Sequence, residues 1–352
     1  MKLSTVIGLA AATAVFTGAT MLVNWSGTDD PVVERAGEPV FPDLEERLDD
    51  VQRITLTNNV RTLTIHRDEG TWRLKEFADY PARQARVREL LIGLADLEYY
   101  EPKTSRPDLY ERLELNDVTD DRSRVRHITL YGADDQELLD VYAGKNRFNL
   151  PGAQNKGIYL RFPGKEQTWL TRGSFVPVED PMRWIDQSII DLPSTTWQRV
   201  TLLSPAGEKI VFTKEDPDST DYKVANPPEG KSAEGGWSVN VVGSVLTGLD
   251  LEDVKRAEEV DFENNEVWRA TYESYDGLTV NIRMADIRTD YWAVFDASAG
   301  ENASENAVKL ASDINDETAG WAYRLVSYKA TPLRTRMDEL IAESGAEGSP
   351  GR

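Results

Sequence analysis

The sequence predicts an α+β protein in which an N-terminal transmembrane helix precedes two tandem, similar modules. Each module is expected to hold an antiparallel-rich sheet and one main helix. Three observations predict this class: an uncharged apolar run opens the chain, short strand patterns alternate with amphipathic helix patterns, and the order strands–helix–strands occurs twice. The length of 352 residues exceeds that of an ordinary single domain, and 40% hydrophobic residues suffice for real cores.

The leader is the first element in order. Val6–Val23 is an uncharged run that as a helix would span about 27 Å, close to the thickness of a hydrocarbon core. One lysine precedes it and Asp29 and Asp30 follow, so the basic end is expected inside and the body outside. Cleavage of a signal peptide after Ala19 is the alternative. Both alternatives place the body outside the cytoplasm, on the periplasmic side if the cell has two membranes.

Charge and turn residues suggest where the remaining divisions fall. Residues 28–50 hold nine acids, two bases and three prolines, which favours an extended, self-repelling spacer. The predicted divisions are a signal anchor over 1–27, an acidic proline-containing spacer over 28–48, a first module over 49–190, a second module over 191–344 and a disordered tail over 345–352.

The two modules differ in charge. Residues 51–190 carry 21 bases and 22 acids, whereas residues 191–352 carry 16 bases and 30 acids. The first module could therefore approach an anionic lipid surface, and the second would be repelled from it.

Periodicity predicts the elements of each module. In the first module, strands are expected at 54–56, 63–66, 72–74, 125–131, 138–142, 158–162 and 168–170, with a helix over 82–97. In the second, strands are expected at 199–203, 210–213, 222–224, 269–274, 279–283, 291–296 and 321–328, with a helix from Ser238 to Leu249. Short helices are expected after Asp180, between the modules, and over 332–343.

The ends of the two main helices are similar in sequence. Ile92–Glu98 resembles Thr247–Glu252, with Gly93 and Gly248 in corresponding places and one residue of slippage. Together with the repeated order of elements, this similarity favours a tandem duplication. Chance convergence of two amphipathic helices on Leu and Gly is the alternative.

Composition excludes several classes of function. There are 40 Lys and Arg against 61 Asp and Glu, a net charge of −21, which would repel the phosphate backbone of nucleic acids. The absence of cysteine excludes disulfides, thiol nucleophiles, thiolate metal sites and a lipid-modified cysteine. Only His66 and His127 carry imidazoles, which excludes a multi-histidine zinc site. Both are interpreted as solvated strand residues.

No catalytic, cofactor or metal motif is found. A Gly-x-Ser-x-Gly elbow is absent, and the isolated pair Gly235-Gly236 is no phosphate loop, so no nucleotide is expected. Asp216–Asp221 and Asp313–Glu317 are acidic but lack the central Gly and late Glu of an EF-hand, so no metal is expected. The nine Trp residues of an exported chain suit sugar stacking, and a carboxylate pair for glycoside hydrolysis is the enzymatic alternative.

One basic cluster is a candidate contact surface. Arg122, Arg124 and Arg126 lie two positions apart, so on a strand all three would project from one face. They could contact lipid head groups or an acidic partner, or they could be an ordinary solvated face.

A diffuse pattern of apolar and turn residues over roughly 49–250 carries a family resemblance. Its residues are Trp72, Tyr80, Pro81, Ala82, Val87, Leu90, Leu91, Leu94, Leu97, Tyr110, Glu111, Leu113, Leu115, Tyr159, Leu160, Arg161, Gln167, Trp169, Leu170, Pro181, Trp184, Asp186, Ile190, Asp191 and Leu192. In these the chain resembles the uncharacterised domain of unknown function 4340 family, whose members are envelope proteins often encoded beside ABC-type transporter permeases. The resemblance implies a location and a partner, and it supplies no catalytic residues.

The sequence thus predicts a membrane-anchored extracytoplasmic accessory or binding protein without catalytic activity, cofactor or metal. An auxiliary subunit of an ABC-type transport complex is expected, with the cell membrane and multi-span permease subunits as partners. The alternatives are an exported hydrolase acting on envelope polysaccharide and a purely structural envelope protein.

Overall fold

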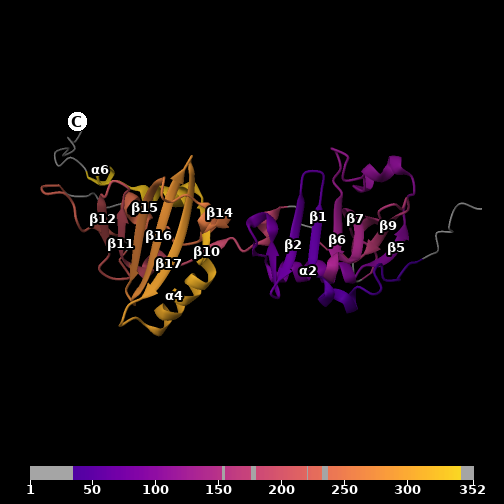
Figure 1. The fold of residues 1–352 in the computed structure, drawn as a ribbon, viewed down its shortest axis with the longest axis horizontal. Helices are drawn as coiled ribbons and strands as arrows, with labels where there is room; N and C mark the ends of the chain where they lie inside the picture. Colours follow the sequence, from indigo (N-terminus) through magenta and orange to yellow (C-terminus); the bar gives the residue numbers. More distant parts are fainter. Residues whose placement is uncertain (1–34, 153–154, 176–179, 220, 232–236, 342–352) are drawn as a thin grey trace, which may run out of the picture. The chain divides into compact units, whose positions relative to one another are not determined.

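A computed structural model describes residues 35–152, 155–175, 180–219, 221–231 and 237–341 (Figure 1). The structure mixes helices with two antiparallel nine-stranded sheets. In the described residues no helix is both long and apolar enough to cross a membrane. The predicted leader, residues 28–34 of the predicted spacer and the predicted tail lie outside the described residues. The rest of the predicted spacer is not extended and free: Val40 and Leu44 are buried, and the Val40 amide donates to the Leu97 carbonyl at 2.7 Å.

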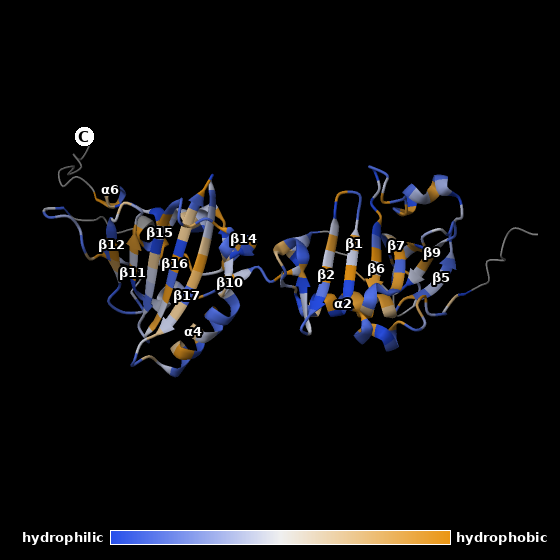
Figure 2. Ribbon diagram, viewed as in Figure 1, coloured by the Kyte–Doolittle hydropathy of each residue, from blue (hydrophilic) through white to orange (hydrophobic). Residues whose placement is uncertain are grey.

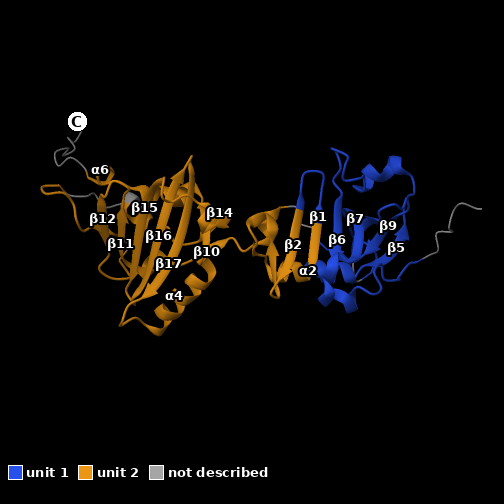
Figure 3. Cartoon of the chain, in the orientation of Figure 1, with its two compact units in different colours: residues 1–51, 56–62, 89–177 blue, residues 52–55, 63–88, 178–352 orange. Residues whose placement is uncertain are grey.

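The chain divides into two compact units, coloured in Figure 3. One contains the described parts of 1–51, 56–62 and 89–177, and the other contains those of 52–55, 63–88 and 178–352. The domain boundaries predicted from the sequence stay predictions.

The first sheet has the strand order β4-β3-β2-β1-β6-β7-β8-β9-β5. Its strands are β1 (Arg53–Thr57), β2 (Thr62–Asp68), β3 (Thr71–Leu74), β4 (Tyr80–Pro81), β5 (Glu98–Pro102), β6 (Arg126–Tyr131), β7 (Glu137–Phe148), β8 (Lys156–Arg161) and β9 (Thr168–Arg172). The helices of this region are α2 (Gln84–Ala95) and the 3-10 turns η1 (Glu45–Asp50), η2 (Lys75–Phe77), η3 (Pro107–Leu113) and η4 (Ala133–Asp135).

The second sheet has the order β10-β14-β18-β17-β16-β15-β11-β12-β13. Its strands are β10 (Ser188–Ile190), β11 (Trp197–Leu203), β12 (Lys209–Thr213), β13 (Lys223–Val224), β14 (Leu249–Arg256), β15 (Glu266–Ser274), β16 (Leu278–Ile287), β17 (Asp290–Ala299) and β18 (Trp321–Leu325). The helices are α3 (Trp237–Gly243), α4 (Glu305–Thr318), α5 (Ser327–Ala330) and α6 (Met337–Leu340), with 3-10 turns η5 (Pro181–Trp184), η6 (Ser194–Thr196), η7 (Ala257–Glu259) and η8 (Thr331–Arg334).

Alternation of apolar and polar residues explains the strands. In β1, Ile54 and Leu56 are buried between half-exposed neighbours, and β15 repeats the pattern with Trp268, Ala270 and Tyr272. Figure 2 shows apolar residues concentrated on the strands of both sheets. The period-2 pattern therefore turns one side of these strands toward a core, whereas β8 and β9 are buried on both sides. Each predicted strand is present, but the strand predicted over 321–328 ends at Leu325, and α5 begins at Ser327.

The predicted first helix is confirmed as α2, which is shorter than expected. Its Val87, Leu90 and Leu94 are buried on one face. The chain after Asp96 becomes β5, a strand that the sequence prediction missed, because Glu98-Tyr99-Tyr100-Glu101 is too short to show alternation. β7 is also longer than predicted.

The second half departs from the prediction of one main helix. The predicted helix from Ser238 to Leu249 is only the seven-residue α3, and turns follow it, although Val245, Leu246 and Leu249 are buried as expected. Among the described residues the longest helix is α4, which was not predicted. Its buried face consists of Ala307, Ala311, Ile314 and Thr318, which is too weakly apolar to stand out in sequence.

The two short helices were predicted with mixed success. Asp180 caps η5 by accepting a hydrogen bond from the Met182 amide at 3.0 Å, as expected. The predicted helix over 332–343 is instead η8 and α6, separated at Thr335 and Arg336, whose backbone is extended.

The two sheets share one connectivity. From β3 to β5 the first sheet runs β3-β2-β1-β6-β7-β8-β9-β5, and from β13 to β14 the second runs β13-β12-β11-β15-β16-β17-β18-β14, which is the same order of equivalent strands. The pairing irregularities also agree, since β5 skips a residue after Tyr99 and β14 skips one after Leu251. In both sheets an upstream segment pairs with that strand, at Pro39 with Glu98 and at Ser188 with Asp250.

The register corrects the sequence match between the helix ends. Tyr99 and Leu251 occupy equivalent positions in their strands. Gly93 lies six residues before Tyr99, and Val245 lies six residues before Leu251, so Gly93 corresponds to Val245 and not to Gly248. Gly93 lies inside α2, whereas Gly248 follows the turns after α3 with a φ of +54°. The repeated topology is therefore real, but the similarity of the two glycines is a coincidence of composition.

Candidate functional site

The three candidate arginines do not form one row on a strand. β6 begins only at Arg126, whose side chain is 16% exposed and donates to the Gly144 carbonyl. Arg124 and Arg126 each lie 3.8 Å from a carboxylate oxygen of Glu114. Arg122 lies in a turn, where its amide donates to Asp120 Oδ1 at 2.9 Å. Only Arg122 and Arg124 are open to solvent, and their contact with a partner stays a prediction.

The two histidines occupy strands, as expected. His66 on β2 lies 3.6 Å from Asp79 Oδ1. His127 on β6 contacts Asp140 Oδ1, and its ring lies 4.7 Å from that of Tyr142. Thr129 donates to the same Asp140 oxygen at 3.4 Å. Hydroxyl and imidazole thus share one carboxylate, whereas a nucleophilic triad needs the imidazole between hydroxyl and acid.

A buried arginine is the main polar feature that sequence reasoning missed. Arg161 on β8 is only 8% exposed, and its guanidinium lies 4.8 Å from the Tyr110 ring and 4.6 Å from the Tyr142 ring. Its Nε donates to the Leu115 carbonyl at 3.2 Å. Burial raises the pKa of both tyrosines, which stay neutral. The cluster attaches the segment from η3 onward to the sheet.

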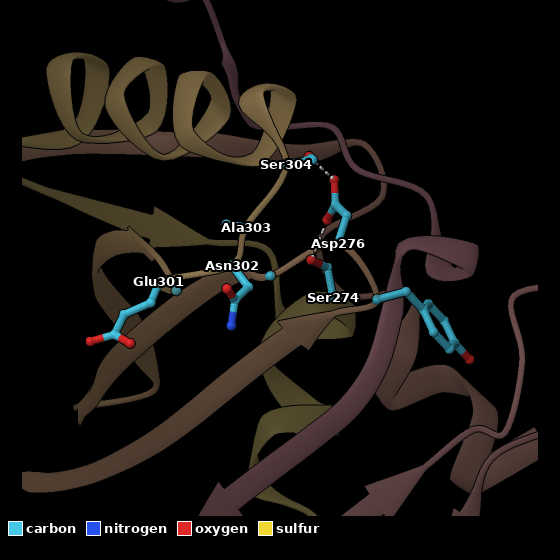
Figure 4. Close-up of a pocket in the computed structure, with 9 residues that line it drawn as sticks. Ser274, Asp276, Glu301, Asn302, Ala303 and Ser304 are labelled. Atoms are coloured by element: carbon cyan, nitrogen blue, oxygen red, sulfur yellow. Dashed lines mark hydrogen bonds between the residues drawn. The ribbon is translucent and has the colours of Figure 1, made fainter.

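An open hollow of ≈ 480 Å³ lies between the β15–β16 turn and the loop before α4 (Figure 4). Its lining residues are Ser274, Tyr275, Asp276, Gly277, Gly300, Glu301, Asn302, Ala303 and Ser304. Asp276 accepts hydrogen bonds from Ser274 Oγ at 2.5 Å and Ser304 Oγ at 2.9 Å. Ser304 in turn caps α4 by accepting from the Ala307 amide.

The electrostatics of this hollow do not suit acid catalysis. The hydrogen bond from Ser274 lowers the pKa of Asp276, so its carboxyl group is ionised at neutral pH and cannot serve as the general acid of glycoside hydrolysis. Figure 4 shows Glu301, the other acid of the hollow, directed away from Asp276. The arrangement anchors a turn to the start of a helix.

The acids of the loop that begins at Asp216 also serve the fold. Asp216 Oδ1 accepts from the Ser219 amide at 2.9 Å, and Asp221 Oδ1 accepts from Asn240 Nδ2 at 2.6 Å. Asp313–Glu317 is part of α4. Within the described ranges, no group of three or more His, Asp or Glu could hold a metal ion. Gly235 and Gly236 lie outside those ranges.

Comparison with known proteins gives one match. The model of the family described as a domain of unknown function (DUF4340) matches residues 72–250, from β3 into β14. Neither the curated proteins nor the solved structures contain a match to the chain. Because the match covers half of its length, the chain belongs to the domain of unknown function 4340 family.

Proposed function

We propose that the protein is a single-pass, membrane-anchored accessory subunit of an ABC-type transport complex, with its body outside the cytoplasm and no catalytic activity of its own. The observation that carries this proposal is the uncharged apolar run Val6–Val23, which as a helix is long enough to span a membrane. An anchor confines a subunit to the membrane plane and raises its effective concentration near co-embedded permeases.

The geometry of the body supports binding over hydrolysis. An exported hydrolase acting on polysaccharide is the second candidate, because the hollow beside Asp276 holds two acids. The hydrogen bonds that Asp276 accepts from Ser274 and Ser304 favour a structural role for it, and Glu301 is directed away from Asp276. A purely structural envelope protein is the third candidate.

The repeated topology supports an origin by tandem duplication. Equal strand order, an equal pairing irregularity and an upstream segment on the equivalent strand are three separate agreements between the halves. Duplicated binding modules provide two related surfaces on one chain, which suits an assembly role.

Affinity isolation of the full chain from detergent-solubilised membranes tests the proposed function. Multi-span permease subunits should be recovered with it, and mass spectrometry should find leader peptides upstream of Ala19 still attached. Deletion of residues 1–27 should reduce the recovery sharply. Replacement of 1–27 by an unrelated single-span anchor is the matched control and should restore it, since the anchor acts by confinement.

Two results would decide for another function. Turnover of envelope polysaccharide by the purified body, abolished by Asp276→Asn, would establish the hydrolase. Retention in the envelope with neither permease recovery nor turnover would favour the structural protein.

A further inference from the structure

A row of exposed cations crosses the outer face of the second sheet. We define this outer face as the side that carries Thr201, Thr271 and Asn281, opposite to the buried Leu202, Ala270 and Ile282. On this face, Lys209 pairs with Leu203, Leu203 pairs with Arg269, and Arg269 pairs with Arg283. Arg283 pairs in turn with Val294, and Lys255 pairs with Ala322. Cross-strand partners lie on the same face of a sheet. We call Lys209, Arg269, Arg283 and Lys255 the cationic row.

All four side chains of the cationic row are exposed. Arg283 lies 5.3 Å from the Phe262 ring and Lys255 lies 4.6 Å from the Trp292 ring. Over the described part of the chain, no carboxylate forms an ion pair with any of the four. On this face, Glu273 pairs with Arg199 at 3.5 Å and Asp296 accepts from Asn281 at 2.7 Å. Asp253, two residues before Lys255, accepts from the Val254 amide at 2.9 Å.

This arrangement is unfavourable for the isolated fold. Arg269 and Arg283 are direct cross-strand partners, and like charges in that position destabilise a sheet. The half that contains them has 30 acids and only 16 bases, so carboxylates to neutralise them are abundant in the sequence. A partner that neutralises the cationic row would relieve this repulsion.

The first sheet shows what lies on the equivalent positions. The residue skipped after Tyr99 in β5 and after Leu251 in β14 gives a common reference point. When the cross-strand partners are followed from it across each sheet, Arg269, Arg283 and Val294 correspond to His127, Tyr142 and Arg161. There, the β5–β6 connection over 103–125 covers the sheet.

Two contacts hold that connection in place. Tyr110 stacks on the Arg161 guanidinium at 4.8 Å, and Glu114 lies 3.8 Å from Arg126. In the second half the equivalent β14–β15 connection, residues 257–265, is much shorter. It packs on the small cluster of Val260, Trp292 and Ala322, and its Phe262 ring lies 5.3 Å from Arg283.

We propose that the cationic row docks an acidic polypeptide segment of a partner protein. This deepens the proposed accessory function, on which it rests, by assigning the chemistry of the partner. Half-buried Leu203 and Val294 flank the two arginines and provide apolar contact on either side. The strongly acidic surroundings disfavour an anionic bilayer, which would extend over them and meet repulsion around the row, whereas a flexible acidic polypeptide can contact the row alone.

Binding of a labelled Glu–Tyr random copolymer to the full chain in neutral detergent micelles tests the proposal. The double charge reversal R269E/R283E should weaken binding about tenfold or more. It should leave the melting temperature near that of the wild type, because it replaces one like-charged cross-strand pair by another. The conservative variant R269K/R283K should retain most of the affinity.

The matched control is K231E/K309E, which changes the net charge by the same amount as R269E/R283E. One of its substitutions lies in the loop after β13 and the other on α4. It should bind like the wild type, whereas an equal loss in both double variants would mean a general charge effect and overturn the proposal. Binding of phosphatidylglycerol vesicles through the same two arginines, with no copolymer binding, would assign the row to lipid and also overturn it.

Affinity isolation separates this proposal from the accessory function. If R269E/R283E recovers permease subunits as well as the wild type does, the cationic row is not the docking surface, although the accessory function stands. If the wild type recovers none, the accessory function fails whatever the copolymer does.

Discussion

The two halves of the molecule share one order of strands, but their connections cover different parts of the two sheets. In the first half the long β5–β6 connection crosses the sheet and encloses Tyr110, Tyr142 and Arg161. In the second half that connection is short, and the extra chain is inserted between β17 and β18, where it forms α4. The strands thus act as a common frame, and the connections decide which surface of each sheet is covered.

One residue makes the comparison quantitative. Gly144 on β7 lies two residues beyond Tyr142, so its equivalent on β16 is Ala285. A Cβ at Gly144 would lie 2.1 Å from the Leu113 carbonyl oxygen of the covering segment. Glycine is required where backbone approaches this closely, whereas the second half, with its short connection, accommodates alanine.

The largest expected effect is therefore at this position. Gly144→Ala should destabilise the protein by about 2–3 kcal/mol, because the clash is with backbone and the covering segment must shift. Ala285→Gly is the matched variant and should cost under about 1 kcal/mol. Chemical denaturation measures both, and hydrogen exchange should show lost protection at Tyr110–Leu115 only in the first variant. Equal costs would break the comparison.

Asn315 offers the second test, because it lies in α4, the helix inserted between β17 and β18. From α4 its side chain accepts from the Ala297 amide and donates to the Ala297 carbonyl, both at 2.8 Å, where β18 no longer pairs with β17. Asn315→Ala should cost about 1.5 kcal/mol by leaving these backbone groups without partners. Asn306→Ala, an exposed position in the first turn of the same helix, is the control and should change stability by less than about 0.5 kcal/mol in the same denaturation.

Asp276 predicts a small pH dependence of the second half. The hydrogen bond from Ser274 lowers its folded-state pKa below the ordinary value of 3.8. Its contribution is therefore fully present above that value and is lost as the pH falls through the folded-state pKa. The melting temperature of Asp276→Asn should lie below the wild type by a constant margin at pH 5–8, and the two should converge below about pH 4. A margin that persists at the lowest pH would mean that the charge is irrelevant.

The smallest effect concerns the cationic row. Single Arg269→Glu should stabilise the protein by about 0.5 kcal/mol, since it replaces a like-charged cross-strand pair with an attractive one. Thermal melts at low salt should show the gain, and added salt should shrink it. A loss of stability would show that Arg269 contributes to the fold and would weaken the argument that the row is kept for a partner.

Local periodicity was sufficient for much of the fold. Alternation located most of the strands but missed β4, β5, β10 and β14. The 3–4 spacing of Val87, Leu90 and Leu94 located α2, and Asp180 followed by proline located η5, because each of these signals lies within one short stretch of chain. Composition likewise excluded thiol and multi-histidine chemistry, since the chain has no cysteine and only two histidines. The leader and the accessory function were predicted from the same source and stay predictions.

Tertiary structure alone decided the rest. α4 buries mainly small residues and Ile314, so its helical pattern carries little hydrophobic signal, and its position depends on the bonds of Asn315 to a strand edge. The three candidate arginines were predicted on one strand, but a turn closed by Asp120 separates Arg122 from β6. The cationic row joins residues from Lys209 to Arg283 that share a face only through strand register, a long-range property that no local pattern contains.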